Sequence, residues 1–494
     1  MKRYFLCLLL ILAMLLPGCK KEQACQVHAD QDEDFLCDDC GLNVLLYFDF
    51  YAINDLHGKL ADATTHPGVD ELTTYLRTMQ ANDDVAILLS VGDMWQGSAE
   101  SNMTGGLIIT DWMNDLDFAA MTLGNHEYDW GEEFIESNAQ AAQFPLLAIN
   151  IYDRESNRQV AYCRSSVVVD CGGLQIGIIG AIGDCYGSIA PDKVQDVYFK
   201  TGKELTALVK AESERLRREE GVDFVVYMLH DGHGNSGGNF ISDAALSSYY
   251  DISLSNGYVD LVFEGHTHQS YLFRDSYGVY HVQSGGDNKG ISHVEIGYHS
   301  ITGDFYVTQS ELIQTDVYSQ LPDDPIVEKL LEKYQEEISD ANQILGINAT
   351  YRDRNELRRL IAQLYLQAGQ EKWGEAYDIV LGGGFISIRS PGHLAAGEVE
   401  YGMLQSLFPF DNELVLCSIR GRDLLDRFIN TTNDNYFISR SDNRKIDPTA
   451  TYYIIVDSYS SGYAPNRLTE IDRYGADVFA RDLLADYIAQ GGLN

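Results

Sequence analysis

Basic residues are scarce in this chain. It has 35 Lys and Arg against 74 Asp and Glu over 494 residues, a formal net charge of −39. A surface of this sign repels polyanions, which argues against nonspecific binding of nucleic-acid polymers. Any small anionic substrate must therefore be attracted by local cations. Most of the carboxylates are expected to belong to a solvated surface.

Long apolar runs are also missing, apart from one at the start of the chain. Two basic residues precede Tyr4–Leu16, which is shorter than the ~20 residues that span a bilayer and ends in Leu16-Pro17-Gly18-Cys19. The pattern resembles a bacterial lipoprotein signal peptide over residues 1–18, with Cys19 as the lipidated first residue. It predicts an extracytoplasmic protein anchored to a membrane by lipid alone, and an ordinary secretory signal is the alternative.

Cysteine is sparse too, with nine residues in the chain, and several lie in an acidic tether over residues 19–45. The spacings Cys25-x-x-His28 and Cys37-x-x-Cys40 offer two pairs of soft ligands. Such a set predicts one tetrahedral structural zinc ion. A disulfide among the three cysteines and weak calcium binding by the carboxylates between the pairs are the alternatives.

Metal-ligand side chains follow five apolar runs in order along the chain. The runs Leu45–Ala52, Asp84–Val91, Phe118–Leu123, Asp223–Leu229 and Asp260–Phe263 have the length and composition of buried strands. The segments after them are Asn54-Asp55-Leu56-His57-Gly58, Gly92-Asp93, Gly124-Asn125-His126-Glu127, His230-Asp231-Gly232-His233 and Gly265-His266-Thr267-His268. Loops at the carboxyl ends of strands are where α/β folds place their sites.

These five segments contain no cysteine, so an iron–sulfur cluster or a Cys₄ site is not expected. Carboxylate, imidazole and carboxamide groups instead suit two divalent ions such as Zn, Mn, Fe or Co. Two ions about 3.5–4 Å apart need a bridging anion, and Asp93 in its Gly-Asp turn is the expected bridge. Each motif alone is more often a cap or a turn, but five together predict a two-metal hydrolytic centre.

In this order the five segments resemble the calcineurin-like metallophosphoesterase superfamily, specifically the bacterial 5'-nucleotidase / UDP-sugar hydrolase family. The resemblance covers residues 46–494 and implies an α/β (α+β) fold, a βαβα sandwich followed by a smaller C-terminal α/β domain. It implies that one ion is held by Asp55, His57, Asp93 and His268, and the other by Asp93, Asn125, His230 and His266. It also implies that His126 is the catalytic histidine and that Asp129 orients its ring, with His233 in a supporting position.

Strand and helix patterns alternate along the first part of the chain, with a helix expected over Gly202–Glu219. No Gly/Ser-rich linker separates the expected domains. The expected organisation is a signal peptide (1–18), the tether (19–45), the phosphoesterase domain (46–320), a connecting helix (321–345) with helical periodicity over Ile326–Ile344, and a substrate-binding domain (346–494).

Three segments of the C-terminal part resemble the substrate-binding domain of the same family: Gly382-Gly383-Gly384, Phe408-Pro409-Phe410-Asp411-Asn412 and 456–463. In that family an arginine after the glycines binds substrate and two aromatic rings enclose the base. Here extra residues separate the glycines from Arg389. The resemblance gives the arginine role to Arg389, and Phe437 and Tyr463 are the expected aromatic pair. Simple core packing is the alternative for each ring.

The sequence thus predicts an exported 5'-nucleotidase-type enzyme in which a hydroxide held by two metal ions attacks the phosphorus of a nucleotide. A UDP-sugar hydrolase and a 2',3'-cyclic-nucleotide phosphodiesterase with 3'-nucleotidase activity are alternatives. A non-catalytic surface lipoprotein that binds metal or nucleotide is an alternative of another class. The intact His126 and Asp129 pair argues against that last alternative, and the altered glycine segment argues for it. No protein partner is inferred.

Overall fold

The structure is a computed structural model that describes residues 29–31, 35–38, 42–62, 67–82, 85–232, 250–463, 466–475 and 478–493. Several predicted positions lie outside these ranges, namely Cys19, Cys25, His28, Cys40 and His233. Lipidation and the tether zinc site therefore stay predictions. Of the tether ligands the structure describes Cys37, which is buried. No helix in the described ranges is long and apolar enough to cross a membrane.

The first sheet has the strand order β14-β13-β1-β2-β3-β4. Its members are β1 (Leu45–Ile53), β2 (Ala86–Ser90), β3 (Ala120–Thr122), β4 (Leu146–Leu147), β13 (Gly290–His299) and β14 (Phe305–Gln314). Strands β1 to β4 are parallel, β13 is antiparallel to its neighbour β1, and β14 is antiparallel to β13. The carboxyl ends of β1, β2 and β3 therefore share one edge.

The second sheet has the order β11-β12-β10-β9-β7-β6. It is built from β6 (Ser166–Cys171), β7 (Leu174–Ile182), β9 (Phe224–His230), β10 (Leu261–Glu264), β11 (Ser270–Arg274) and β12 (Tyr280–Ser284). The neighbours β7, β9 and β10 are parallel. Their carboxyl ends also meet at one edge, which brings the ends of β9 and β10 to the same side as the loop after β7.

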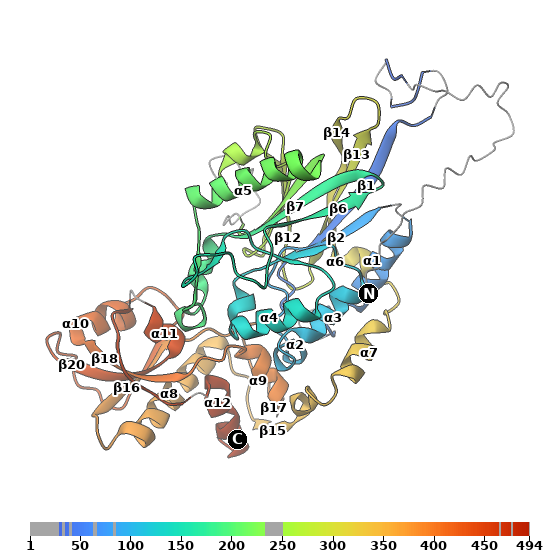
Figure 1. Ribbon diagram of the computed structural model, residues 1–494. Coiled ribbons are helices and arrows are strands. Elements are labelled where there is room, and N and C mark those ends of the chain that lie inside the picture. Colours follow the sequence, from blue (N-terminus) through green and yellow to red (C-terminus); the bar gives the residue numbers. More distant parts are fainter. Residues whose placement is uncertain are drawn as a thin grey trace.

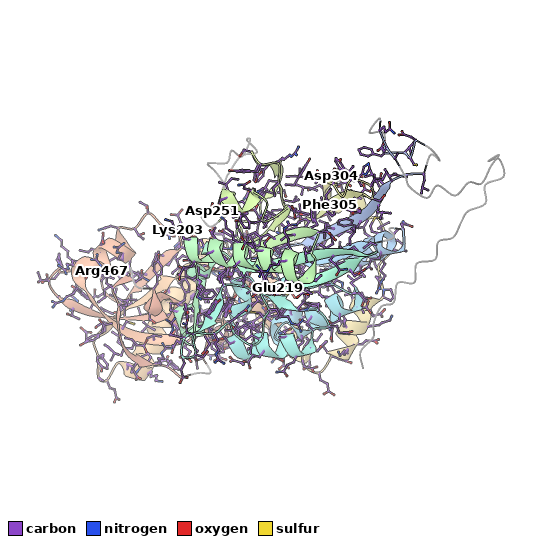
Figure 2. All side chains as sticks on the ribbon, turned by 45° about the horizontal axis from the view of Figure 1, so that its top comes forward. Lys203, Glu219, Asp251, Asp304, Phe305 and Arg467 are labelled. Carbon is purple, nitrogen blue, oxygen red and sulfur yellow. The ribbon has the colours of Figure 1, made fainter. Side chains whose placement is uncertain are left out.

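The two sheets pack face to face, because alternate apolar residues of each, such as Phe50 and Val226, share one core. Helices cover the outer faces, giving four layers (Figure 1). On the first sheet lie α1 (Asp70–Asn82), α3 (Leu107–Asp115), α4 (Glu132–Ala141) and α7 (Ile326–Lys333), with the shorter α2 (Ala99–Met103) and α6 (Thr315–Tyr318). Figure 2 shows α5 (Lys203–Arg215) across the outer face of the second sheet. A two-stranded pair, β5 (Ile151–Asp153) and β8 (Val197–Phe199), completes this part.

The C-terminal part forms a five-stranded sheet of order β19-β16-β20-β18-β21. Its strands are β16 (Ile379–Phe385), β18 (Leu414–Arg420), β19 (Tyr436–Arg440), β20 (Thr451–Asp457) and β21 (Thr469–Arg473). Helices α8 (Arg354–Trp373) and α12 (Ala480–Ala489) pack on one face, and α10 (Gly421–Leu424) on the other. The remaining elements are α9 (Tyr401–Leu407), α11 (Ser458–Gly462) and the pair β15 (Ile344–Asn348) and β17 (Gly397–Glu400).

The prediction of one connecting helix over Ile326–Ile344 is wrong. Helix α7 ends at Lys333, turns follow, and a single 3₁₀ turn over Ser339–Asn342 leads into β15. Tertiary contacts override the helical periodicity here: Tyr334 donates a hydrogen bond to Asp111 at 2.7 Å. Further on, the backbone of Ala341 packs closely against α9. The expected helix over Gly202–Glu219 is confirmed, as α5 followed by a π-helical turn.

Candidate active site

The seven predicted metal-ligand side chains gather where strands of the two sheets end. Asp55, His57 and His268 place one potential ligand atom each within 4.8 Å of one another, and so do Asp55, Asp93 and His230. Asn125 and His266 line a cavity that begins at the same edge. The structure thus brings together side chains from five loops whose sequence positions span more than 200 residues.

Several imidazole nitrogens and carboxylate oxygens of this cluster lie unusually close to one another. Nε2 of His57 lies 3.1 Å from Nε2 of His268, which in turn lies 3.4 Å from Oδ1 of Asp55. Nε2 of His230 lies 3.1 Å from Oδ2 of Asp93. Two imidazole nitrogens that face each other beside a carboxylate have the arrangement of ligands around a common cation.

Five of these residues have a left-handed backbone. The φ angles are 52° for Asp55, 51° for His57, 54° for Asp93, 70° for His266 and 53° for His268. Positive φ is uncommon in residues with a Cβ and costs on the order of 1 kcal/mol each. Such conformations persist where the surrounding structure imposes them, and they are concentrated at functional sites. Their clustering at the strand ends is independent support for a site at this edge.

Two buried polar residues that sequence reasoning did not assign hold these loops together. Glu127 accepts hydrogen bonds from the backbone N–H groups of Asp93 (2.9 Å), Met94 (2.8 Å) and Gly124 (2.7 Å). Asn54 donates to Oδ2 of Asp55 at 2.7 Å and accepts from the hydroxyl of Ser284, at the end of β12, at 2.9 Å. Both residues adjoin a predicted site residue in the sequence, which is the signal that could have identified them.

His126 is held by two carboxylates at the mouth of the cluster. Its Nδ1 lies 2.7 Å from Oδ2 of Asp129, and its backbone N–H donates to Oδ1 of Asp93 at 2.8 Å. Burial opposes a charge on this ring, but the nearby Asp129 and Asp93 carboxylates raise the pKa of His126. With Nδ1 engaged by Asp129, Nε2 is the nitrogen left to act on a bound group.

The chemistry of the donors fits two divalent cations. Burial, followed by the charges of Arg389 and His268, lowers the pKa of His57, and burial lowers that of His266 to about 4, so these two imidazoles are neutral as metal ligands must be. Burial also opposes a charge on His230, but the Asp93 carboxylate raises its pKa to about 10, so a metal bound there must displace a proton. Oδ1 of Asn125 and Nε2 of His230 are buried and make no well-oriented hydrogen bond. Such atoms need a partner, and a cation supplies one.

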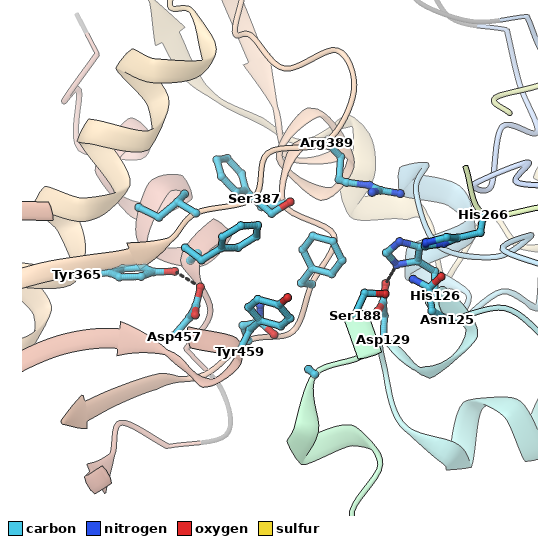
Figure 3. A pocket seen from close by; sticks show the side chains of 17 residues that line it. Asn125, His126, Asp129, Ser188, His266, Tyr365, Ser387, Arg389, Asp457 and Tyr459 are labelled. Atoms are coloured by element: carbon cyan, nitrogen blue, oxygen red, sulfur yellow. Dashed lines mark hydrogen bonds and ion pairs between the residues drawn. The ribbon is translucent and has the colours of Figure 1, made fainter. Parts of the chain in front are cut away.

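A cavity of about 240 Å³ connects this cluster to the C-terminal part of the chain. One wall contains Asn125, His126, Asp129 and His266, and the other contains Arg389 and the aromatic side chains of Tyr365, Phe385, Phe408, Phe410 and Tyr459. Figure 3 shows Arg389 reaching across toward His126. An apolar cavity with a few convergent polar groups is the usual form of a small-molecule site.

Comparison with known proteins agrees with the geometry. Residues 48–270, which contain all five ligand-bearing loops, match the calcineurin-like phosphoesterase family. The chain carries a calcineurin-like phosphoesterase domain. The fold extends further: a 5'-nucleotidase precursor from Thermus thermophilus superposes over 90% of this chain and 96% of its own with a TM-score of 0.67 at 19% identity.

Curated relatives are about a quarter identical to this phosphoesterase over the aligned segments. A 5'-nucleotidase from Vibrio vulnificus is 24% identical over 75% of this chain and 71% of its own. An apyrase from Tabanus yao is 25% identical over 76% of this chain and 72% of its own. The predicted α/β sandwich with a second α/β part is confirmed, as is the prediction of a hydrolase related to 5'-nucleotidases.

The three predicted substrate-binding residues of the phosphoesterase fall in different places. Arg389 reaches the site: its Nη2 lies 3.2 Å and 3.3 Å from the two ring nitrogens of His57. Tyr463 is 41% exposed and stacks on Tyr459, with ring centroids 6.4 Å apart, beside a neighbouring cavity. Phe437 is not brought to the site, because its strand β19 turns the ring toward Arg358 on α8, 5.6 Å away.

Phe410 is the ring that sequence reasoning missed. Its centroid lies 6.0 Å from the centroid of His126 and 6.0 Å from the guanidinium carbon of Arg389. It belongs to the segment Phe408–Asn412 that carries the family resemblance, so its position in that motif was the available signal. Phe410 and Tyr459 line the cavity beside the phosphoesterase centre, whereas Phe437 is not among its lining residues.

Proposed function

We propose that this protein is an exported 5'-nucleotidase-type phosphohydrolase that removes phosphate from nucleotides. The observation that carries the proposal is a single cavity that joins a metal-ligand cluster and His126 to an aromatic wall containing Arg389. A phosphoryl group and a base attached to the same substrate need these two chemistries at the two ends of one cavity.

In this proposal Asp55, His57, Asp93 and His268 hold one divalent ion, and Asp93, Asn125, His230 and His266 hold the other. When bound, the two ions supply an activated water and neutralise charge on the phosphoryl oxygens. His126 presents Nε2 to the phosphoryl or leaving oxygen, while Asp129 fixes its tautomer and ring orientation through the 2.7 Å contact. Arg389 binds a phosphate oxygen beside His57.

In this proposal the aromatic wall of the cavity binds the base of the nucleotide. Phe410 and Tyr459 offer ring faces in the cavity, and stacking on such rings is worth roughly 1–3 kcal/mol per base. Because every base has a π-face, this wall accepts different nucleosides. The buried Asp457, whose pKa burial raises to about 6, lines the same cavity and offers a polar group to the base or ribose.

Local cations overcome the repulsion expected from the net charge of −39. A cavity of about 280 Å³ beside His57 and His268 is lined by Lys59, Arg354, Arg358 and Arg389, with Asp287 as its one carboxylate among the lining residues. Cations concentrated at one cleft focus the field there and attract anions despite the sign of the whole surface. This arrangement favours substrates that carry phosphate.

A UDP-sugar is the second candidate substrate. A further cavity of about 420 Å³, lined by Tyr436, Tyr459 and Tyr463, also reaches His266. Two cavities that meet at the cluster suit a substrate with groups on both sides of the scissile bond. The proposed export and lipid anchor place either substrate outside the cytoplasm, on the evidence of the sequence around Cys19.

Hydrolysis of a panel of compounds, followed by chromatography of the products, tests the proposal. The mature protein, loaded with Mn²⁺, Co²⁺ or Zn²⁺, is assayed with nucleoside 5'- and 3'-monophosphates, 2',3'-cyclic nucleotides, a UDP-sugar and an aryl phosphate. The highest kcat/KM is expected for 5'-monophosphates. A higher value for cyclic nucleotides or a UDP-sugar would reassign the substrate. No hydrolysis of any compound, measured by chromatography of the products, would leave a non-catalytic binding protein.

A further inference from the structure

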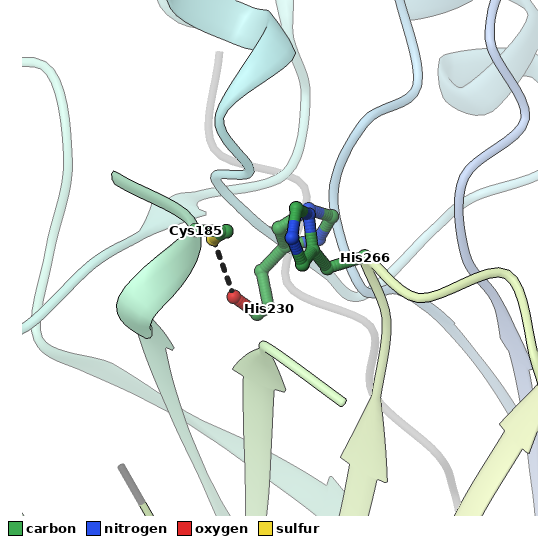
Figure 4. Close-up of side chains that lie close together, drawn as sticks. All are labelled: Cys185, His230 and His266. Carbon is green, nitrogen blue, oxygen red and sulfur yellow. Dashed lines mark hydrogen bonds between the residues drawn. The ribbon is translucent and has the colours of Figure 1, made fainter. Parts of the chain in front are cut away.

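A buried thiol lies next to one half of the proposed metal centre. Cys185, His230 and His266 each place one potential ligand atom within 4.8 Å of the others (Figure 4). They come from three elements: a 3₁₀ turn after β7, the last residue of β9, and the loop after β10. Since β7, β9 and β10 are adjacent parallel strands, the topology itself brings the three side chains to one edge.

The loop that carries Cys185 is fixed to the end of β9. The backbone N–H of Gly183 donates to the carbonyl of His230 at 3.1 Å, and the thiol of Cys185 donates to the same carbonyl at 2.9 Å. A Cβ at position 183 would lie 2.3 Å from Cβ of Asp231, so only glycine permits this close approach. The sulfur is therefore positioned beside His230 by backbone contacts.

His230 has one ring nitrogen engaged by the backbone and the other available as a metal ligand. Its side chain is fully buried, and Nδ1 lies 2.5 Å from the carbonyl of Val91, which leaves Nε2 as the ligand atom. Nε2 makes no well-oriented hydrogen bond, although Oδ2 of Asp93 is 3.1 Å away. A cavity lined by Cys185 and His266 gives an ion access to this position.

We propose that Cys185 is an additional ligand of the ion held by His230 and His266, and that it makes this half of the centre selective for thiophilic divalent ions. Zn²⁺, Co²⁺ and Cd²⁺ accept thiolate readily, whereas Mn²⁺ and Mg²⁺ prefer oxygen. On binding, the sulfur–metal bond replaces the hydrogen bond to the His230 carbonyl, and the thiol proton passes to solvent. Asp55, His57 and His268 in the other half bring no sulfur, so the two ions differ in kind.

Cobalt spectroscopy tests this inference on the full mature chain. Because Cys25, Cys37 and Cys40 are also thiols, the background carries all three as serine. Cobalt loading is expected to give a near-ultraviolet sulfur-to-cobalt charge-transfer band, and adding Cys185→Ser is expected to abolish it while cobalt stays bound. Cys163→Ser is the matched control, since that buried thiol also donates to a backbone carbonyl, at 3.4 Å, away from the cluster.

Two further measurements keep the test decisive. Cys185→Ser is expected to weaken Cd²⁺ binding by roughly 10–100-fold and Mn²⁺ binding by less than about 2-fold. X-ray absorption at the zinc edge, on protein that keeps Cys185 and lacks the tether thiols, is expected to show sulfur at about 2.3 Å. A shell of nitrogen and oxygen alone, or equal losses of Cd²⁺ and Mn²⁺ affinity, would overturn the inference.

The inference rests on the metal centre of the proposed function, but the two fail separately. Phosphate release with no sulfur ligation would overturn the role of Cys185 and leave the hydrolase in place. Sulfur ligation in a protein that releases no phosphate would leave the role of Cys185 in place and remove the proposed activity.

Discussion

At the scale of single residues, substitutions of Asp93 and His126 are expected to impair the enzyme in different ways, the first through metal binding and the second through kcat. Asp93 contacts His230 and the backbone of His126, and as the proposed bridge it serves both ions. We expect Asp93→Asn to lower metal content and abolish phosphate release together. We expect His126→Asn to keep its metals and to lower kcat by roughly 10²–10⁴. Metal analysis with kinetics of the purified variants decides, and full metal content with normal turnover in Asp93→Asn would contradict the bridge.

Substitution of Glu127 tests whether its hydrogen bonds to the backbone hold the loops of the site in place. Its carboxylate accepts three backbone hydrogen bonds from two loops, and a carboxamide can accept with only one of its two terminal atoms. We expect Glu127→Gln to lower the free energy of unfolding by roughly 1.5–3 kcal/mol and to weaken metal binding. Thermal unfolding and metal titration measure both effects. Glu133→Gln, at an exposed position of α4 nearby, is the control and should behave as wild type.

At this scale, features that depend on neighbouring residues in the sequence could be predicted, and features that depend on distant contacts could not. The proposed metal-ligand residues follow apolar runs directly, so residue type and strand end are enough to predict where they gather. The partners of Glu127 include Asp93, 34 positions earlier, and no local pattern encodes that contact. Phe437 was misassigned because the direction of its ring follows from the pairing of β19 with β16, in which it lies opposite Gly384.

At the scale of elements, His293 links three strands of the first sheet. From β13 its Nε2 lies 2.7 Å from Asp49 on β1, its Nδ1 lies 3.2 Å from Glu311 on β14, and its ring stacks on Tyr51. Burial opposes the imidazolium, but the hydrogen bonds and charges of Asp49 and Glu311 outweigh it and raise the pKa of His293.

A raised pKa in the folded state gives His293 a stabilising effect that is complete below the unfolded pKa of ~6.5 and is lost as pH rises through the folded value. We expect His293→Gln to lower the free energy of unfolding by about 1 kcal/mol in mild acid and by progressively less as the pH rises. Denaturant unfolding across pH measures the difference. A constant difference at all pH values would show that only packing was lost.

Strands were easier to predict than the connection between the two parts. All five ligand-bearing apolar runs form strands, because continuous burial on both faces leaves a continuous apolar sequence. The segment after Lys333 has helical periodicity but not a continuous helix, since its apolar side chains contact two different cores. Helical periodicity of apolar residues predicts that they are buried, but it does not predict which part of the protein covers them.

At the scale of the whole molecule, the proposed function assigns chemistry to one wall of the cavity and base recognition to the other. We expect Phe410→Ala with Tyr459→Ala to lower kcat/KM for 5'-nucleotides by at least ~10-fold, a loss of about 1.4 kcal/mol, because stacked bases position the phosphate. Hydrolysis of an aryl phosphate, which lacks a nucleoside, should change little. Phe437→Ala is the matched control. Equal losses on both substrates would mean that the rings support the fold instead.

Removal of the metal ions is expected to destabilise the whole protein. At about 1,000 times its Kd a ligand adds ~4 kcal/mol to the free energy of unfolding, and the two proposed ions would bind loops from both sheets. We expect a chelator to lower Tm by roughly 5–10 °C and added metal to restore it. Calorimetry measures the shift. Asp93→Asn serves as the comparison and should show little response to the chelator.

The left-handed backbone at the five loop positions is expected to shorten the lifetime of the metal-free protein. A newly folded chain that meets no ions bears the conformational strain of Asp55, His57, Asp93, His266 and His268 without the metal–ligand bonds that we propose to offset it. Its unfolded population is then larger, and proteases act on that population. If the proposed centre is correct, metal supply therefore sets the number of folded copies as well as the rate at which each one works.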